Sequence, residues 1–223
     1  MKLKLLSKKS EVPGVYTFVF KPDKPTSWVP GQYLHYILPH PNPDNRGIER
    51  WFTISSAPYE RNICITTRFA GKKGSSFKKA LLSLDVGSEI EADGVEGDFT
   101  LVAGNVRHVL IAGGIGITPY HAMLTQLFHD KKDVHAQLLY ANQDKNLVFG
   151  DELAKIESSL KYFHVQPFIG RRLVPDDFKK YVDDSGSIFY LSGPEPLVEN
   201  YEGVLQEMGV PKERIKTDFF PGY

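Results

Sequence analysis

The chain has 223 residues, which is enough for one large domain or for two of about 100 to 120 residues each. Its 27 basic and 27 acidic side chains balance, so composition gives no electrostatic case for binding nucleic acid or an anionic membrane. No apolar run approaches the roughly 18 residues of a membrane span. The single cysteine, Cys64, excludes an internal disulfide and a cysteine-ligated iron–sulfur or zinc site within this chain.

The N-terminal stretch "MKLKLLSKKSEVPGVYTF" contains lysines and a few leucines but no long apolar core and no small-residue cleavage site. We therefore expect it to form a first strand, and we expect a cytoplasmic protein.

Up to about residue 103 the sequence consists of short β-like runs separated by turn residues. They are "GVYTFVFKP", "GQYLHYILP", "RWFTISSAP", "NICITTRFA" and "SEIEADGVEG". A helical pattern interrupts them from about Phe77 to Leu84. Several short strands with regular turns predict a closed antiparallel β-barrel.

After residue 106 apolar runs alternate with helical patterns, as in "HVLIAGGIGITPYHAMLTQLF" and "SIFYLSGPEPLVENYEGVLQ". This alternation is typical of βαβ units around a parallel sheet. We therefore predict two domains, a β-barrel over residues 1–103 and an α/β domain over residues 104–223. Domain pairs of this kind commonly bind a ligand in the cleft between them.

The stretch "RWFTISSAP" combines an arginine, aromatic rings and hydroxyls in one predicted strand. Arg50 has a planar guanidinium group that can form two hydrogen bonds to a pyrophosphate, while Phe52 and Thr53 suit contacts with a flat ring. Strict alternation places Arg50 and Thr53 on opposite faces, so contact of both with one ligand requires a bent strand or a ligand that wraps around its edge. The alternative is an ordinary barrel strand with a surface arginine.

In "RFAGKKGSSFKKALLSL" three small residues, Gly74, Ser75 and Ser76, come directly before the predicted helix. Serines are good N-caps, and a helix N-terminus offers free N–H groups to an anion. The stretch predicts either a phosphate site on the barrel or simply a capped helix.

The first glycine junction, "VLIAGGIGITP", follows a predicted buried strand from Val109 to Ala112. Its glycines let the backbone approach a ligand closely, and Thr118 and Pro119 open a helix whose N-terminus favours a phosphate. The alternative is a tight strand-to-helix turn.

The second junction, "IFYLSGPEPLVE", has the same form, with Ser192, Gly193 and Pro194 after a strand from Ile188 to Leu191. Both strands are expected to end on the same carboxyl edge of the sheet, where α/β sheets bind ligands. Two loops on one edge suit a dinucleotide, and an ordinary crossover turn is the alternative.

Seven motifs in order resemble those of the ferredoxin–NADP reductase superfamily over nearly the whole chain. They are PGQ at 30–32, R-x-F-T with S-x-P at 50–58, G-x-x-S ahead of the first helix, G-x-F at 97–99, GGIGITP at 113–119, SGP at 192–194 and the C-terminal DFFPGY. The resemblance implies an FAD-binding barrel, a pyridine-nucleotide-binding α/β domain and the two-domain form without an iron–sulfur domain. Members move a hydride from NAD(P)H to the flavin and then electrons to a partner.

The resemblance implies that Arg50 contacts the flavin pyrophosphate, that Phe52 stacks near the isoalloxazine and that Thr53 hydrogen-bonds near its N5. A pyrophosphate needs both Arg50 and the helix start, which favours FAD over FMN. The flavin-binding residues implied on the barrel are Arg50, Trp51, Phe52, Thr53, Thr67, Arg68, Gly74, Ser75 and Ser76.

On the α/β side the resemblance implies nucleotide binding by Gly114, Gly116, Thr118, Pro119, Gly193 and Pro194. Ser192 stands where the superfamily usually has a cysteine near the nicotinamide. An aromatic at the C-terminus, Phe219 or Phe220, is expected to cover the flavin, with Tyr223 as a further candidate and simple core packing as the alternative. The residues implied at the reacting rings are Thr53, Ser192 and Phe219.

The implied activity is an FAD-dependent reductase that oxidises NADH or NADPH and serves a separate acceptor, either a ferredoxin-type or other redox protein or a small oxidant. The end of the second α/β strand reads "LLYANQDKN" and has no arginine for a 2′-phosphate, which favours NADH slightly. The alternative is that Lys145, Arg171 or Arg172 folds toward the ribose and binds the 2′-phosphate of NADPH. The alternative is a flavin-binding regulatory or electron-transfer module with weak or no NAD(P)H oxidation. The sequence leaves the acceptor and the oligomeric state open and nominates no general acid or base.

Overall fold

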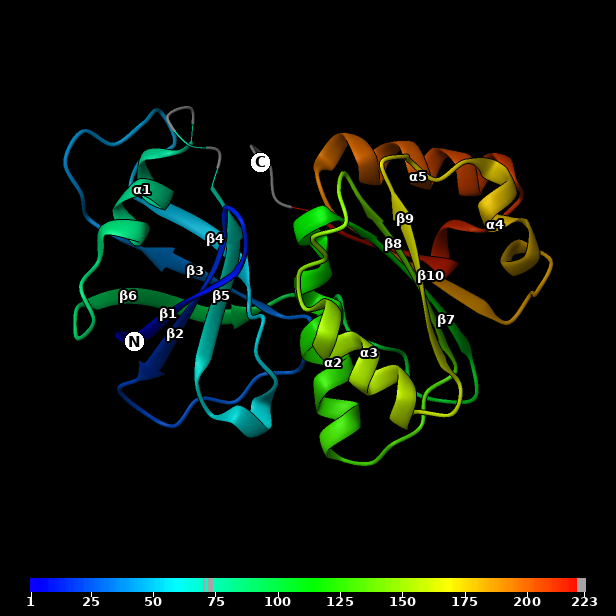
Figure 1. Cartoon of the computed structure of the whole chain (residues 1–223), viewed down its shortest axis with the longest axis horizontal. Helices are drawn as coiled ribbons and strands as arrows, with labels where there is room; N and C mark the ends of the chain where they lie inside the picture. Colours follow the sequence, from blue (N-terminus) through cyan, green and yellow to red (C-terminus); the bar gives the residue numbers. More distant parts are fainter. Residues whose placement is uncertain (70, 72–73, 220–223) are drawn as a thin grey trace.

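The computed structural model describes every residue except 70, 72–73 and 220–223, and it contains two sheets side by side (Figure 1). The first half forms a six-stranded antiparallel sheet in the order β4-β3-β6-β1-β2-β5. Its strands are β1 (Lys2–Val12), β2 (Val15–Pro22), β3 (Tyr33–Ile37), β4 (Glu49–Thr53), β5 (Ile63–Arg68) and β6 (Glu89–Glu96).

Hydrogen bonds just after β4 bring the two edges of this sheet together. The Ser55 N–H donates to the Cys64 carbonyl at 3.0 Å, and the Ser55 and Thr66 hydroxyls are 2.8 Å apart. Because β4 and β5 are the edge strands, these bonds roll the sheet into the predicted barrel.

Alternating burial fills the inside of the barrel. In β3 Leu34 and Tyr36 are fully buried while their neighbours are partly exposed, as the period of two in a strand requires. Helix α1 (Ser76–Ser83) adds Phe77 and Leu81 to this core and begins one residue before the predicted start. A short 3-10 turn, η1 (Pro58–Glu60), precedes β5.

The second half is a five-stranded parallel sheet in the order β11-β10-β7-β8-β9. Its strands are β7 (Arg107–Gly113), β8 (Ala136–Asn142), β9 (Phe163–Ile169), β10 (Ser187–Ser192) and β11 (Ile215–Asp218). The helical elements are η3 (Gly114–Ile117), α2 (Thr118–His129), α3 (Gly150–Ser159), α4 (Pro175–Val182), α5 (Glu195–Glu207) and η4 (Lys212–Arg214). This confirms the predicted α/β architecture.

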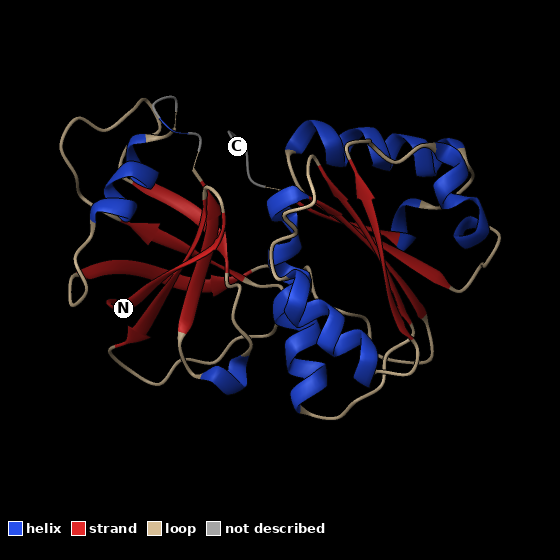
Figure 2. Cartoon of the chain, in the orientation of Figure 1, coloured by secondary structure: helices blue, strands red, loops and turns tan. Residues whose placement is uncertain are grey.

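Helices cover both faces of the parallel sheet (Figure 2). Leu110 and Ala112 pack in the core that contains α2 and α3, whereas Val109 and Ile111 pack in the core that contains α4 and α5. A strand buried on both faces has no polar side, which explains the unbroken apolar run of β7.

The two halves pack directly against each other through α2 and the segment after β6 (Figure 1). Phe99 contacts Tyr120 and Tyr190 at ring-centroid distances of 5.9 and 5.6 Å. His121 Nδ1 of α2 donates to the Ser55 carbonyl of the barrel at 2.7 Å. The predicted boundary after residue 103 lies between β6 and β7 and stays a prediction.

The PGQ motif belongs to this packing. Gly31 has a φ of +100°, and a Cβ there would lie 2.0 Å from the Phe99 carbonyl oxygen, so only glycine fits. In the part of the chain that the structure describes, no helix is both long and apolar enough to cross a membrane.

Candidate functional site

A pocket lies where the barrel meets the carboxyl edge of the parallel sheet. The barrel contributes the ends of β4 and β5, and the α/β domain contributes η3, the start of α2 and the ends of β10 and β11. Its lining residues are Phe52, Thr53, Thr66, Thr67, Ile115, Gly116, Thr118, Ser192, Gly193, Pro194, Asp218 and Phe219. The structure therefore brings predicted site residues from both halves of the chain into one place.

The two glycine junctions meet at one wall of this pocket. Strands β7 and β10 are parallel neighbours with Ala112 opposite Ser192, which confirms that both junctions share the carboxyl edge. A Cβ on Gly116 would lie 2.2 Å from the Ser192 carbonyl oxygen. Because no side chain fits there, the glycine lets the two loops close on each other.

Three polar side chains meet at the base of the pocket. Ser192 is 2% exposed, and its hydroxyl donates to Asp218 Oδ2 at 3.1 Å. The Thr53 hydroxyl also hydrogen-bonds the Asp218 carboxylate. Burial raises the pKa of Asp218 to about 6, although the two hydroxyls act in the opposite direction.

Asp218 was missed by the sequence prediction, which selected the aromatics of the same C-terminal motif. The signal was present, because a carboxylate directly precedes Phe219 at the end of a strand that pairs with β10. Nothing local indicated that this carboxyl would meet Ser192 and Thr53.

The two threonines of β5 differ in how their hydroxyls are used. Thr66 Oγ1 lies 2.8 Å from both Thr17 and Ser55 hydroxyls. Thr67 is 1% exposed, and in the part of the chain that the structure describes its buried Oγ1 has no hydrogen-bond partner. An orphaned hydroxyl on a pocket wall is a group that a ligand can satisfy. Arg68, also predicted at the site, is exposed.

Two predicted aromatics line the pocket, and another lies elsewhere. Phe52 and Phe219 are both on its walls. Trp51 is 46% exposed and stacks on His35 with 4.5 Å between ring centroids. It points away from the barrel interior, so the structure does not bring it to the pocket. The predicted residues Phe220 and Tyr223 lie outside the described residues.

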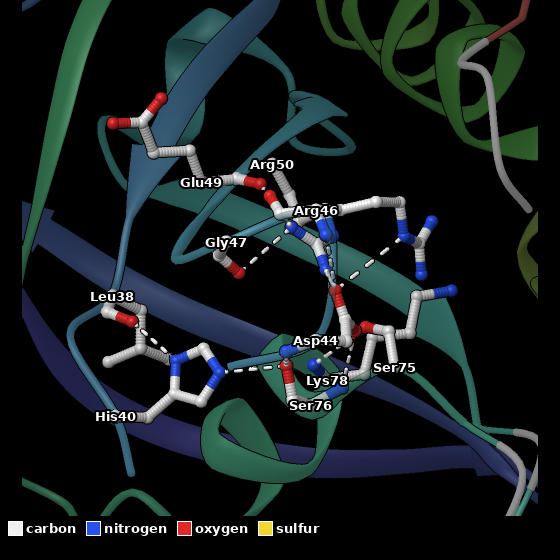
Figure 3. A network of polar contacts seen from close by, with 10 residues as sticks. All are labelled: Leu38, His40, Asp44, Arg46, Gly47, Glu49, Arg50, Ser75, Ser76 and Lys78. Carbon is white, nitrogen blue, oxygen red and sulfur yellow. Dashed lines mark hydrogen bonds and ion pairs between the residues drawn. The ribbon is translucent and has the colours of Figure 1, made fainter. Parts of the chain in front are cut away.

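Arg50 lies in a second polar cluster, at the N-terminus of α1 (Figure 3). Its guanidinium donates to Asp44 Oδ1 at 2.7 Å and to the carbonyls of Arg46, Gly47 and Glu49. The other Asp44 oxygen accepts the Ser76 N–H at 2.9 Å. Arg50 and the predicted phosphate-binding helix start are therefore together, joined by a carboxylate that the sequence prediction did not select.

The serines of α1 are engaged within the chain. Ser75 caps the helix by accepting the Lys78 N–H at 3.2 Å. The Ser76 hydroxyl accepts the Asp44 N–H at 2.8 Å and lies 2.9 Å from His40 Nε2. His40 Nδ1 donates to the Leu38 carbonyl at 2.7 Å, which fixes the orientation of the ring.

Opposing contributions act on the pKa of Asp44. Burial raises it, but hydrogen bonds from the Ser76 and Arg46 backbone and the Arg50 guanidinium outweigh burial and hold the pKa well below its ordinary value. This is a permanent anion inside a cationic site.

Phe52 connects the two sites. It lines the pocket and packs against Phe77 of α1 with 5.8 Å between ring centroids. Thr53 faces the pocket while Arg50 faces the cluster, as the predicted alternation requires.

Near the end of β8 the candidate coenzyme-selecting residues are held within the chain. The Asn142 amide donates to the carbonyls of Asp144 and Asn146 at 2.8 and 3.2 Å. Arg171 forms a bidentate pair with Asp177 at 2.7 and 2.8 Å. The predicted residues Gly114 and Pro119 lie at the start of η3 and α2.

Residues 110–202 match the family model described as Oxidoreductase NAD-binding domain. A flavohemoprotein of Rhodopirellula baltica is 24% identical over 92% of this chain and 57% of its own length. The structure resembles the flavohem-like FAD/NAD-binding domain of the Vibrio cholerae nitric oxide dioxygenase, with a TM-score of 0.79, 23% identity and 98% of each chain covered. It also resembles a Neisseria gonorrhoeae ferredoxin–NADP⁺ reductase with bound FAD and NADP, with a TM-score of 0.80, 18% identity, and 98% of this chain and 97% of that chain covered.

The chain has the two-domain fold of these proteins, an antiparallel sheet followed by a parallel sheet, and its second half matches the NAD-binding family model. The chain spans 57% of the flavohemoprotein of Rhodopirellula baltica. The roles of the individual site residues stay predictions.

Proposed function

We propose that the chain is an FAD-dependent NAD(P)H oxidoreductase that passes electrons to a separate acceptor, either a ferredoxin-type or other redox protein or a small oxidant. One observation carries this proposal. The pocket between the two halves joins Thr53 of the barrel to Ser192 and Asp218 of the α/β domain. A site built from both domains suits a reaction between two bound cofactors.

The residues present fit a flavin with a phosphate-bearing tail. Thr67 offers a buried hydroxyl that lacks a partner, and Phe52 offers a flat apolar surface on the same pocket. Arg50 and the α1 N-terminus already bind one anionic group, the Asp44 carboxylate. We therefore propose Arg50, Gly74, Ser75 and Ser76 for the pyrophosphate, and Phe52, Thr53 and Thr67 for the ring.

When bound, FAD accepts a hydride from NAD(P)H and releases the electrons to an acceptor. In this proposal Gly116 and Gly193 let the backbone come close to the nicotinamide, and Thr118 with the α2 N-terminus holds the nucleotide phosphates. Phe52, Ile115 and Phe219 exclude water from the pocket. Asp218 holds or releases a proton at Oδ2, the atom to which Ser192 donates.

We propose NADH as the coenzyme. An NADP-binding site needs a cation for the 2′-phosphate, and Arg171 is engaged with Asp177. The cytoplasmic location expected from the sequence belongs to the same proposal.

The experiment is anaerobic addition of NADH or NADPH to the purified, FAD-loaded protein while its visible flavin absorption is recorded. We expect rapid loss of the flavin band with NADH and slower loss with NADPH. Bound flavin that neither coenzyme reduces would contradict the reductase.

That outcome would support a second candidate, a flavin-binding regulatory or electron-transfer module. Ser192 favours it, because the hydroxyl replaces the cysteine usual in the superfamily and is already committed to Asp218. If NADH does reduce the flavin, mixing the reduced protein with candidate acceptors distinguishes a protein acceptor from a small oxidant.

A further inference from the structure

Asp44 lies in the segment between β3 and β4, and its carboxylate binds the donors expected to hold a phosphate (Figure 3). Oδ2 accepts the N–H of Ser76, the first residue of α1, at 2.9 Å. Oδ1 accepts from the Arg50 guanidinium at 2.7 Å and from the Arg46 N–H at 3.0 Å. The two oxygens of one carboxylate thus join an arginine to a helix N-terminus, which is an arrangement suited to a phosphate group.

Positive charge exceeds negative charge around this carboxylate. Arg46 Nε lies 3.8 Å from Asp44 Oδ1, and Lys78 enters the same cluster from α1 (Figure 3). Two guanidinium groups therefore lie against this one carboxylate, and the nearby Lys78 ammonium donates to the Arg68 carbonyl at 3.2 Å. Burial and the nearby charges of Arg46 and Arg50 lower the pKa of Lys78 to about 8, which is the direction expected where cations are not fully balanced.

Arg50 retains an unused donor in this cluster. The residue is 9% exposed, and its Nε is buried without a hydrogen-bond partner among the described residues. A single carboxylate leaves that N–H unsatisfied, whereas a phosphate or pyrophosphate has further oxygens to accept it.

The segment that carries Asp44 is closed by a hydrogen bond at its base and is otherwise held by polar contacts with Ser76 and Arg50. The Leu38 N–H donates to the Ile48 carbonyl at 2.9 Å and closes the loop. Between these residues the chain is mostly exposed, and Asn42 and Gly47 have φ values of +50° and +69°. Asp44 is therefore able to leave α1 without breaking the β3–β4 pairing.

We propose that Asp44 is a built-in competitor for the phosphate group of the flavin. Its carboxylate closes the anion site in the flavin-free protein, and a phosphate-bearing flavin binds by displacing it from Arg50 and Ser76. This inference rests on the proposed flavin-binding function. It predicts that removal of the Asp44 charge tightens binding of FAD, although the same charge stabilises the start of α1.

The test is titration of the flavin-free full chain with FAD, FMN and riboflavin, followed by flavin fluorescence. We expect Asp44→Asn to tighten FAD binding about tenfold to a hundredfold, the equivalent of one charge-assisted hydrogen bond. FMN should gain as well. Riboflavin has no phosphate and should bind Asp44→Asn and the wild type equally.

Two further variants complete the flavin titration, a charge-matched control and a second substitution of Asp44. Asp93→Asn changes the same charge at an exposed position of β6 and should alter no flavin affinity. Asp44→Ser also removes the charge but keeps a side chain suited to a helix N-terminus, so the result does not depend on one variant folding. Thermal unfolding of the flavin-free protein should show a lower Tm for both Asp44 variants than for the wild type. The variants should therefore be less stable without flavin and yet bind FAD more tightly.

Unchanged or weaker FAD binding by both Asp44 variants would overturn the proposal, because an aspartate that only orients Arg50 would lower affinity when removed. If no variant binds any flavin, the proposed function fails, and titration with inorganic pyrophosphate decides the competitor role separately. Tighter pyrophosphate binding by Asp44→Asn would support it, and equal binding would overturn it.

Discussion

Two aspartates in this molecule have opposite electrostatic environments. Asp218, in the pocket between the halves, interacts with the Ser192 and Thr53 hydroxyls, and burial raises its pKa to about 6. Asp44, at α1, is bonded by an arginine and two backbone N–H groups, and its pKa is held well below the ordinary value. The comparison shows that the same side chain becomes a proton-exchanging group or a permanent anion according to the donors around it.

The largest effect is expected from Gly116→Ala, which damages the pocket and leaves the α1 cluster intact. The added Cβ would lie 2.2 Å from the Ser192 carbonyl, so the two glycine loops must separate. We expect a loss of about 1 to 3 kcal/mol of stability and a fall on the order of a hundredfold in the rate of flavin reduction by NADH. Stopped-flow absorbance measures the rate. Gly203→Ala is the control, because no atom lies within 4 Å of its added Cβ, and an equal loss there would contradict the steric explanation.

Arg50→Ala changes the α1 cluster, which contains Asp44. It removes the guanidinium that balances Asp44 and that we assign to the pyrophosphate. We expect FAD affinity to fall by about tenfold to a hundredfold, while riboflavin affinity stays the same. Arg107→Ala serves as the control because Arg107 lies on the parallel sheet and pairs with Asp184. If Arg50→Ala binds FAD as tightly as the wild type, the assignment of Arg50 to the pyrophosphate is wrong.

Asp218→Asn tests whether Asp218 makes the stability of the protein depend on pH. A folded pKa of about 6, above the unfolded value, gives stability that is present below pH 4 and is lost as pH rises through 6. We expect the wild type to lose about 1 to 2 kcal/mol of unfolding free energy over this interval from this group, and Asp218→Asn to lose none of it. Denaturant unfolding at several pH values measures the difference.

The contribution of Asp44 to stability depends on pH in the opposite direction, because its pKa in the folded protein is depressed. Its stabilisation is present above pH 4 and is lost as pH falls further. Asp44→Asn should therefore leave the pH 4 to 7 interval unchanged. The contrast between the two aspartates would be contradicted if Asp44→Asn altered the pH dependence of the unfolding free energy between pH 4 and 7. It would also be contradicted if Asp218→Asn left that dependence unaltered.

The smallest effect is expected from Ser192→Ala. Its hydroxyl is one of two that lower the pKa of Asp218, so its removal should move the pH midpoint of flavin reduction upward by less than about one unit. Ser187→Ala is the matched control, since Ser187 is buried on the same strand and its hydroxyl has no partner within the described ranges 1–69, 71 and 74–219. A midpoint that does not move would show that Ser192 acts on the pocket without acting through Asp218.

The positions of the glycine junctions in the site were predictable because they depend on residues that are neighbours in the sequence. Gly116 and Ser192 follow buried strands, and strands of a parallel sheet end on one edge, so their convergence follows from the pattern. The alternation of β4 likewise anticipated that Arg50 and Thr53 face different ways. Trp51 shows the limit of this reasoning, because its position in the motif gave no sign that it would stack on His35 outside the pocket.

The sequence by itself determined the two architectures, the glycine junctions and the hydroxyls at the strand ends, because strand alternation and turn chemistry depend on neighbouring residues. Only the tertiary structure decided which of the 27 acidic side chains matter. Asp44 reaches α1 across 32 residues, and Asp218 reaches Ser192 across 26. Burial and pairing at such separations depend on how the elements pack, and the local sequence does not encode them.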